Sequence, residues 1–209
     1  MPIEGGGNSR LLSLEQSLSI FVNQDNRNPV IFDPRPNTME QLKERDRHTH
    51  NLVLATHHLL SATNSGEKTG IALAGGLACA CHATEGIIYR AHHDLDIMVP
   101  IDSGEKFLSF LAKIFSQRQK TDLSKLARNI YRLEYEEIKI DFFIYEPNYR
   151  DEAVFSGGTY PDIKLGTSFP IQTTTKPLMG KLVSVVPLQV IRLMKHYDAP
   201  IRRKGAVDL

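Results

Sequence analysis

Two aspartates separated by one residue, Asp94 and Asp96, are the side chains in this sequence best suited to chemistry. They alternate with the apolar residues Leu95, Ile97 and Val99. Because side chains on an extended strand repeat every two residues, the pattern predicts a strand with both carboxylates on one face and core residues on the other. Mg²⁺ favours one or two carboxylates together with phosphate oxygens. The pattern therefore predicts a metal-binding strand.

A glycine pair precedes these acids and predicts an anion site beside them. Residues 69–74 are typical of a short buried strand, Gly75-Gly76 of a tight turn, and residues 77–84 of a helix rich in small side chains. This order lets backbone N–H groups approach an anion and places the positive end of a helix dipole next to it. We expect phosphate groups to bind at Gly75 and Gly76.

A third acid, Asp141, lies in the middle of a later predicted strand. Residues 127–135 and 138–145 form two strand-like runs joined tightly at Glu136-Glu137, which is typical of a hairpin. Three acids on adjacent strands, opposite a helix N-terminus, are the apparatus of two-metal phosphoryl or nucleotidyl transfer. The first two aspartates would hold both cations. Asp141 would complete the second metal site and accept the proton of the acceptor hydroxyl.

These residues resemble the nucleotidyltransferase fold of the DNA polymerase β superfamily. The resemblance covers about residues 70–145 and is carried by three segments: Gly75-Gly76, Arg90-x-His92-His93-Asp94-Leu95-Asp96-Ile97 and Ile140-Asp141-Phe142. The most similar groups are bacterial aminoglycoside 2″-adenylyltransferases, lincosamide nucleotidyltransferases and the toxin nucleotidyltransferases of abortive-infection systems. The resemblance implies an α/β nucleotidyltransferase fold, with a mixed, mostly antiparallel-paired sheet flanked by helices. It also implies an NTP donor, ATP first among them, and two Mg²⁺ ions.

The same resemblance assigns roles to basic residues outside the acid cluster. Arg90 would bind the nucleotide and neutralise charge near the acids. Lys195, on a predicted C-terminal helix, would contact the triphosphate. The final run from Arg202 to Leu209 is similar to the closing motif of the relatives, with Gly205 where they have Asp.

The elements that must position these residues follow from local patterns. Residues 1–37 predict a partly irregular arm, and residues 38–209 predict the nucleotidyltransferase domain. Within that domain Thr38 caps a long helix that ends near residue 65. Further helices are expected at residues 103–118 and 187–197, with loops and short edge strands at residues 146–180.

Composition places few further limits on function. A chain of 209 residues with 25 basic and 24 acidic side chains carries a formal charge of +1, which gives no global reason to bind nucleic acid or an anionic membrane. Cys79 and Cys81 are typical of small buried residues rather than a disulfide framework. The absence of a long apolar run predicts a cytoplasmic protein with no membrane partner.

Three functions fit these features. The leading one is metal-dependent transfer of NMP from an NTP to a hydroxyl of a small molecule such as an antibiotic. The second keeps the chemistry but transfers to tRNA, which would bind through the basic loop 117–128 and the tail Arg202–Lys204. The third is a catalytically inactive nucleotide-binding regulator. Ala80 and Gly205 suggest this function, because the relatives often have Asp at both positions.

The three-carboxylate hypothesis has a direct test. Replacement of Asp94 or Asp141 by Asn removes a metal-binding charge, so pyrophosphate release against a competent acceptor should fall sharply. Undiminished release in either variant would contradict the mechanism.

Overall fold

The computed structural model describes residues 30–63, 70–101, 122–127, 129–135, 137–156 and 163–198. Most of the predicted arm and the expected helix at residues 103–118 lie outside these ranges. The elements, in chain order, are α2 (Met39–Arg45), α3 (Arg47–Thr63), β1 (Ala72–Leu73), α4 (Gly75–Ala83), β2 (Leu95–Pro100), β3 (Asp122–Ala127), β4 (Ile130–Tyr135), β5 (Ile138–Pro147), β6 (Glu152–Phe155), β7 (Ile163–Ser168), β8 (Thr174–Leu178), β9 (Lys181–Val185) and α6 (Leu188–Asp198).

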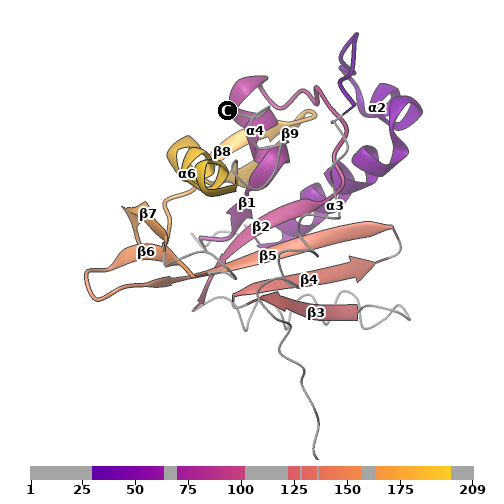
Figure 1. The fold of residues 1–209 in the computed structure, drawn as a ribbon. Helices are drawn as coiled ribbons and strands as arrows, with labels where there is room; N and C mark the ends of the chain where they lie inside the picture. The colour runs from indigo at the N-terminus through magenta and orange to yellow at the C-terminus, as the bar shows by residue number, and fades with distance from the viewer. Residues whose placement is uncertain are drawn as a thin grey trace, which may run out of the picture.

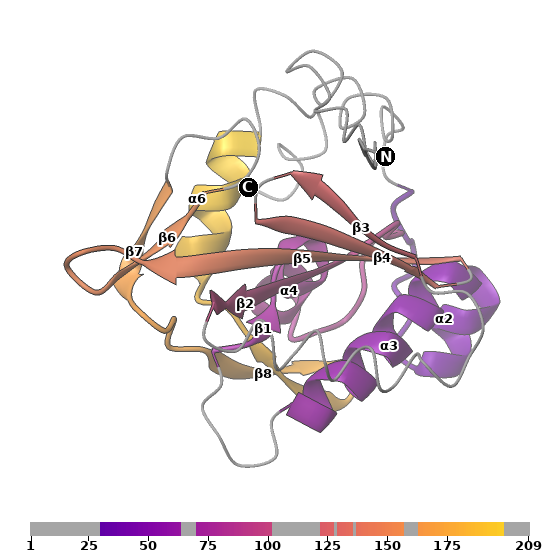
Figure 2. The same cartoon turned by 90° about the horizontal axis from the view of Figure 1, so that it is seen from below.

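The described strands form one mixed sheet, which confirms the predicted α/β fold (Figure 1). Their order is β3-β4-β5-β2-β1-β9-β8, and β6 pairs with β5 and β7 beside this path. Among the described pairs, β1 with β9 and β2 with β5 are parallel, and the others are antiparallel. The β6–β7 pair and the helices α2 and α3 lie at opposite ends of the molecule in both views (Figures 1 and 2). Residues 146–180, which were predicted to form loops and short edge strands, contain the three short strands β6, β7 and β8.

Strands β2 and β5 lie in the middle of the sheet and supply much of its core. Leu95, Ile97 and Val99 of β2 are fully buried, as is Phe142 of β5, and Ile140 of β5 is almost fully buried. Full burial of one such side chain contributes about 1.5–3 kcal/mol. The predicted alternation around the acids is therefore present, and its apolar half anchors the strand that carries Asp96.

The long helix expected from Thr38 to residue 65 is two helices, α2 and α3. Thr38 caps α2 as predicted, since its Oγ1 accepts a hydrogen bond from the backbone N–H of Gln41 at 3.2 Å. Asp46 then interrupts the helix with extended backbone angles. Its Oδ1 accepts hydrogen bonds from the N–H groups of His48 (3.0 Å) and Thr49 (3.2 Å). A carboxylate that caps the next helix explains the break.

Helix α3 is tied to the segment that leads into β2. Thr49 is fully buried, and its Oγ1 accepts the backbone N–H of His92 at 2.8 Å while lying 2.9 Å from Asp46 Oδ2. The segment is held from its other side by residues 30–32, where Ile31 forms a β-bridge with Arg90. The end of the predicted arm therefore pairs next to the acid-bearing strand. The domain division at residue 37 stays a prediction.

No helix within the described ranges is long and apolar enough to cross a membrane.

Replacement of Thr49 by Val should destabilise the protein by about 1–3 kcal/mol, because it removes the acceptor of the buried His92 N–H. Thr56 provides a matched control on the same helix. It is also fully buried, but its hydroxyl donates only to Leu52 O of its own helix, at 2.8 Å. Urea unfolding should show a lower midpoint at unchanged slope for Thr49→Val and a smaller change for Thr56→Val. Equal losses would contradict this role of Thr49.

Candidate active site

A row of charged side chains crosses three neighbouring strands on one face of the sheet. In the parallel pair of β2 and β5, Asp96 lies opposite Asp141. In the antiparallel pair of β4 and β5, Arg132 lies opposite Asp141 on its other side. Neighbouring strands are about 4.8 Å apart, so side chains in register on one face lie within reach of each other. Asp94 lies immediately before β2 begins, two residues from Asp96.

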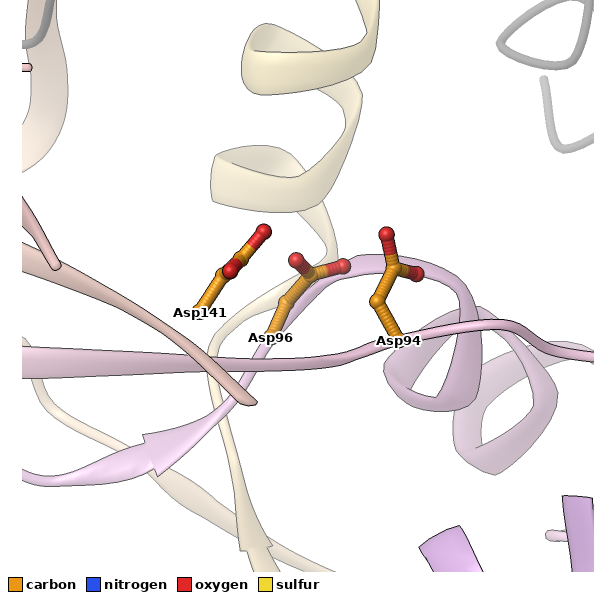
Figure 3. A group of neighbouring side chains, drawn as sticks. All are labelled: Asp94, Asp96 and Asp141. Carbon is orange, nitrogen blue, oxygen red and sulfur yellow. The ribbon is translucent and has the colours of Figure 1, made fainter. Parts of the chain in front are cut away.

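The structure brings the three predicted acids together (Figure 3). One carboxylate oxygen from each of Asp94, Asp96 and Asp141 lies within 4.8 Å of the other two. Figure 3 shows Asp96 between the other two, with the three carboxyl groups turned to the same side. Asp94 and Asp96 are half-buried, and Asp141 is buried. Hard oxygen donors at this separation fit Mg²⁺, so these side chains are suited to hold a divalent cation.

Gly75 makes the close approach between helix α4 and Asp96. Its φ is +63°, and a Cβ added to it would overlap the Asp96 carboxylate, at 2.5 Å from Cγ. The neighbouring Ala74 N–H donates to the backbone oxygen of Asp96 at 2.9 Å. The predicted tight turn is thus the first turn of α4, which begins at Gly75 instead of Leu77. Only glycine fits here without moving the carboxylate.

Gly76 makes a second close approach, to the basic residues before β2. A Cβ at Gly76 would lie 2.5 Å from Arg90 Nη2 and 2.9 Å from His92 Nδ1. Both basic side chains are buried, and Arg90 Nη1 donates to the backbone oxygen of Ala91 at 3.0 Å. Arg90 is therefore next to the glycine pair, and a nucleotide-binding role is predicted for this arginine and for both glycines.

Arg132 is a residue of this site that the sequence did not reveal. Its Nε donates to Asp141 Oδ1 and its Nη2 to Asp141 Oδ2, each at 2.7 Å, which makes a bidentate pair. Both side chains are buried. Burial disfavours the charged guanidinium, but the hydrogen bond to Asp141 and the charges of Asp141, Asp94 and Glu134 outweigh it and raise the pKa of Arg132. The guanidinium stays charged and neutralises part of the acid cluster.

The side chain of one predicted contact, and two predicted binding segments in whole or in part, are not described by the structure. Lys195 lies within helix α6, but its side chain is not among those described. The tail 202–209 is outside the described ranges, and so are residues 117–121 of the basic loop. Residues 122–127, predicted partly as loop, form strand β3.

Comparison with known proteins agrees with this fold. The lincosamide antibiotic adenylyltransferase LnuA, solved with lincomycin bound, is 12% identical with a TM-score of 0.50, and the match covers 76% of this chain and 97% of that one. ANT(2″)-Ia, solved with adenylyl-2″-tobramycin, is 13% identical with a TM-score of 0.50. The match covers 75% of this chain and 88% of that one. The fold is therefore that of a nucleotidyltransferase. No curated protein sequence matches the chain.

The family model described as aminoglycoside-2″-adenylyltransferase matches residues 58–176, which is more than half of the chain. The chain belongs to this family of nucleotidyltransferases, as the resemblance predicted. The matched range contains all three aspartates and the glycine pair, whereas Lys195 lies beyond it.

Replacement of Gly75 by Ala should displace the Asp96 carboxylate and lower pyrophosphate release by about a hundredfold or more. Gly166 is the control, because its φ is +66° but a Cβ there would meet nothing within 4 Å. Both variants carry the same left-handed strain of about 1–2 kcal/mol, and Gly75→Ala adds the overlap with Asp96, so the melting temperature should fall in both variants and further in Gly75→Ala. Only Gly75→Ala should lose activity. A comparable loss in Gly166→Ala would attribute the effect to strain alone.

Proposed function

We propose that this chain is a Mg²⁺-dependent nucleotidyltransferase that moves NMP from an NTP, ATP being the first candidate, to a hydroxyl of an antibiotic-like small molecule. The observation that carries the proposal is the convergence of Asp94, Asp96 and Asp141 within 4.8 Å in a member of the aminoglycoside 2″-adenylyltransferase family. The two structural relatives bind antibiotics of different classes, lincomycin and a tobramycin product. The class of acceptor therefore varies on this fold.

The proposed reaction breaks one bond and forms another at the α-phosphorus of the nucleotide. The acceptor oxygen bonds to this phosphorus, and the bond to the oxygen that bridges the α- and β-phosphorus atoms breaks, which releases pyrophosphate. The hydroxyl proton passes to an oxygen of Asp141. When bound, Mg²⁺ screens the triphosphate charge and lowers the pKa of the acceptor hydroxyl.

The other residues of the chain bind and orient the donor in this proposal. Gly75 and Gly76 begin a helix whose first N–H groups and positive dipole end suit a phosphate. Arg90, packed against Gly76, adds positive charge on the same side. Lys195 would contact the triphosphate from helix α6. Asp94 and Asp96 would hold the cations, because Asp94 immediately precedes β2, Asp96 lies two residues further on, and both are only half-buried.

The proposal predicts which acceptor becomes labelled. The protein is incubated with each NTP labelled at the α-phosphate, Mg²⁺, total RNA and a panel of aminoglycosides and lincosamides. Mass spectrometry should find one panel compound heavier by one nucleotidyl group, which is an NMP less one water, with an equal amount of pyrophosphate released. The Asp96→Asn variant, which keeps the shape of the side chain but loses its charge, should reduce the product by at least about a hundredfold.

Other outcomes would favour the alternative functions. Label transferred to RNA, with binding that weakens steeply as salt rises, would replace the antibiotic acceptor by tRNA. Thermal stabilisation by Mg-ATP with no labelled product would indicate a nucleotide-binding regulator. Equal product formation by the Asp96→Asn variant would contradict the proposed chemistry itself.

A further inference from the structure

An apolar row of side chains follows the acid row on the same face of the sheet. Side chains alternate along a strand, so Met98 follows Asp96 on this face of β2. In the same way Phe143 follows Asp141 on β5. Met98 pairs with Phe143 across β2 and β5, and Ile130 of β4 pairs with Phe143 on its other side. The face therefore changes from charged to apolar within one step along the strands.

Phe143 is the partly accessible member of this apolar row. Met98 is fully buried and Ile130 almost fully buried, whereas Phe143 is only partly buried against the core. Its ring lies against that of Phe155 on β6, with the centroids 5.7 Å apart and an angle of 62° between the planes. An edge-to-face contact of this kind is a favoured arrangement of two aromatic rings and holds them in place. Phe143 thus offers a fixed apolar surface two residues from Asp141.

The geometry of the proposed reaction directs the acceptor toward Phe143. In an in-line displacement the attacking and leaving oxygens lie on opposite sides of the phosphorus. The proposed phosphate site at Gly75 and Gly76 adjoins Asp96 from the side of β1 and of the segment before β2. Asp141 lies on the other side of Asp96, on β5 (Figure 3). The acceptor therefore approaches over β5, where Phe143 follows Asp141.

We propose that Phe143 is a specificity-determining residue, which selects an acceptor with an apolar surface and at most one positive charge beside its reactive hydroxyl. Apolar acceptor surface gains free energy when it leaves water at this row. An ammonium group in the same place loses hydration without gaining a hydrogen bond, which is costly. Asp141 compensates little for this cost, because both of its oxygens already accept hydrogen bonds from Arg132. The site thus disfavours a polycationic aminosugar.

This inference rests on the proposed function and names the class of its acceptor, so acceptor competition in the wild-type protein is its first test. Lincomycin carries a single basic nitrogen and an apolar side chain, whereas tobramycin is a polycation. With labelled NTP and Mg²⁺, kcat/KM for lincomycin should exceed that for tobramycin by about tenfold or more. An equal or higher value for tobramycin would overturn the inference and leave the proposed function intact.

Substitutions of Phe143 test its role separately from stability. Phe143→Glu places a carboxylate beside the acceptor, so the ratio of the two kcat/KM values should move toward tobramycin by about tenfold or more. Phe143→Leu stays apolar and should keep the preference of the wild type. Tyr149→Ala removes an aromatic side chain that is 83% exposed between β5 and β6, and it should match the wild type with both acceptors. An unchanged ratio in Phe143→Glu would overturn the assignment, because a loss of stability lowers both rates alike.

Lincomycin binding gives a readout that does not depend on turnover. The compound is titrated calorimetrically into the protein with Mg²⁺ and an NTP analogue that cannot react. Binding should show a negative heat-capacity change, because apolar surface is buried. Phe143→Ala should bind about tenfold or more weakly, with a smaller heat-capacity change, and undiminished affinity would overturn the role of Phe143. If Phe143→Glu does not fold, this titration and the wild-type competition carry the test. If the wild type labels no compound of the panel and binds none, the proposed function fails and the inference fails with it.

Discussion

The site depends on the register between β2 and β5. These parallel strands place Asp96 opposite Asp141, and apolar residues before and after the two acids share the same pairing, Leu95 with Ile140 and Ile97 with Phe142. A slip of one residue would turn each carboxylate toward the core and each apolar side chain toward the site. Since the apolar side chains are buried, their packing enforces the register that brings the acids together. The geometry of the acid cluster is thus a consequence of core packing.

Close packing around the acids limits which residues the neighbouring elements can carry. Helix α4 approaches Asp96 through Gly75 and the basic residues through Gly76, so neither position has room for a side chain. Arg132 approaches Asp141 from the third strand and binds both of its oxygens. Helix α4, the segment before β2 and strand β4 share no sequence motif, but together they surround the acid cluster. Helix α4 contributes two positions without a side chain, and the other two elements contribute positive charge.

Local patterns were sufficient for part of this arrangement. Alternation predicted the strand of Asp96, the hairpin predicted the strand of Asp141, and the resemblance to a known fold brought them together. The same hairpin could have located Arg132, because a turn at Glu136-Glu137 that pairs residues 135 and 138 also pairs residues 132 and 141. Asp46 could also have been identified from the sequence, because aspartate is a common N-cap residue and this one lies inside the segment predicted as a single helix. In contrast, the bond between Thr49 and His92 joins residues 43 apart, and no local pattern reports such a contact.

The spacing of these partners along the chain also bears on how the protein folds. Arg132 and Asp141 are nine residues apart in one hairpin, whereas Asp96 must reach Asp141 from a distant part of the chain. Local hairpins form in microseconds, and long-range parallel pairing is slower because loop closure costs entropy first. The topology therefore favours an order in which Asp141 already has its guanidinium partner when the other two carboxylates arrive. In that order, part of the negative charge of Asp141 is already neutralised when the other two carboxylates approach it, so the repulsion among the three acids is smaller during folding.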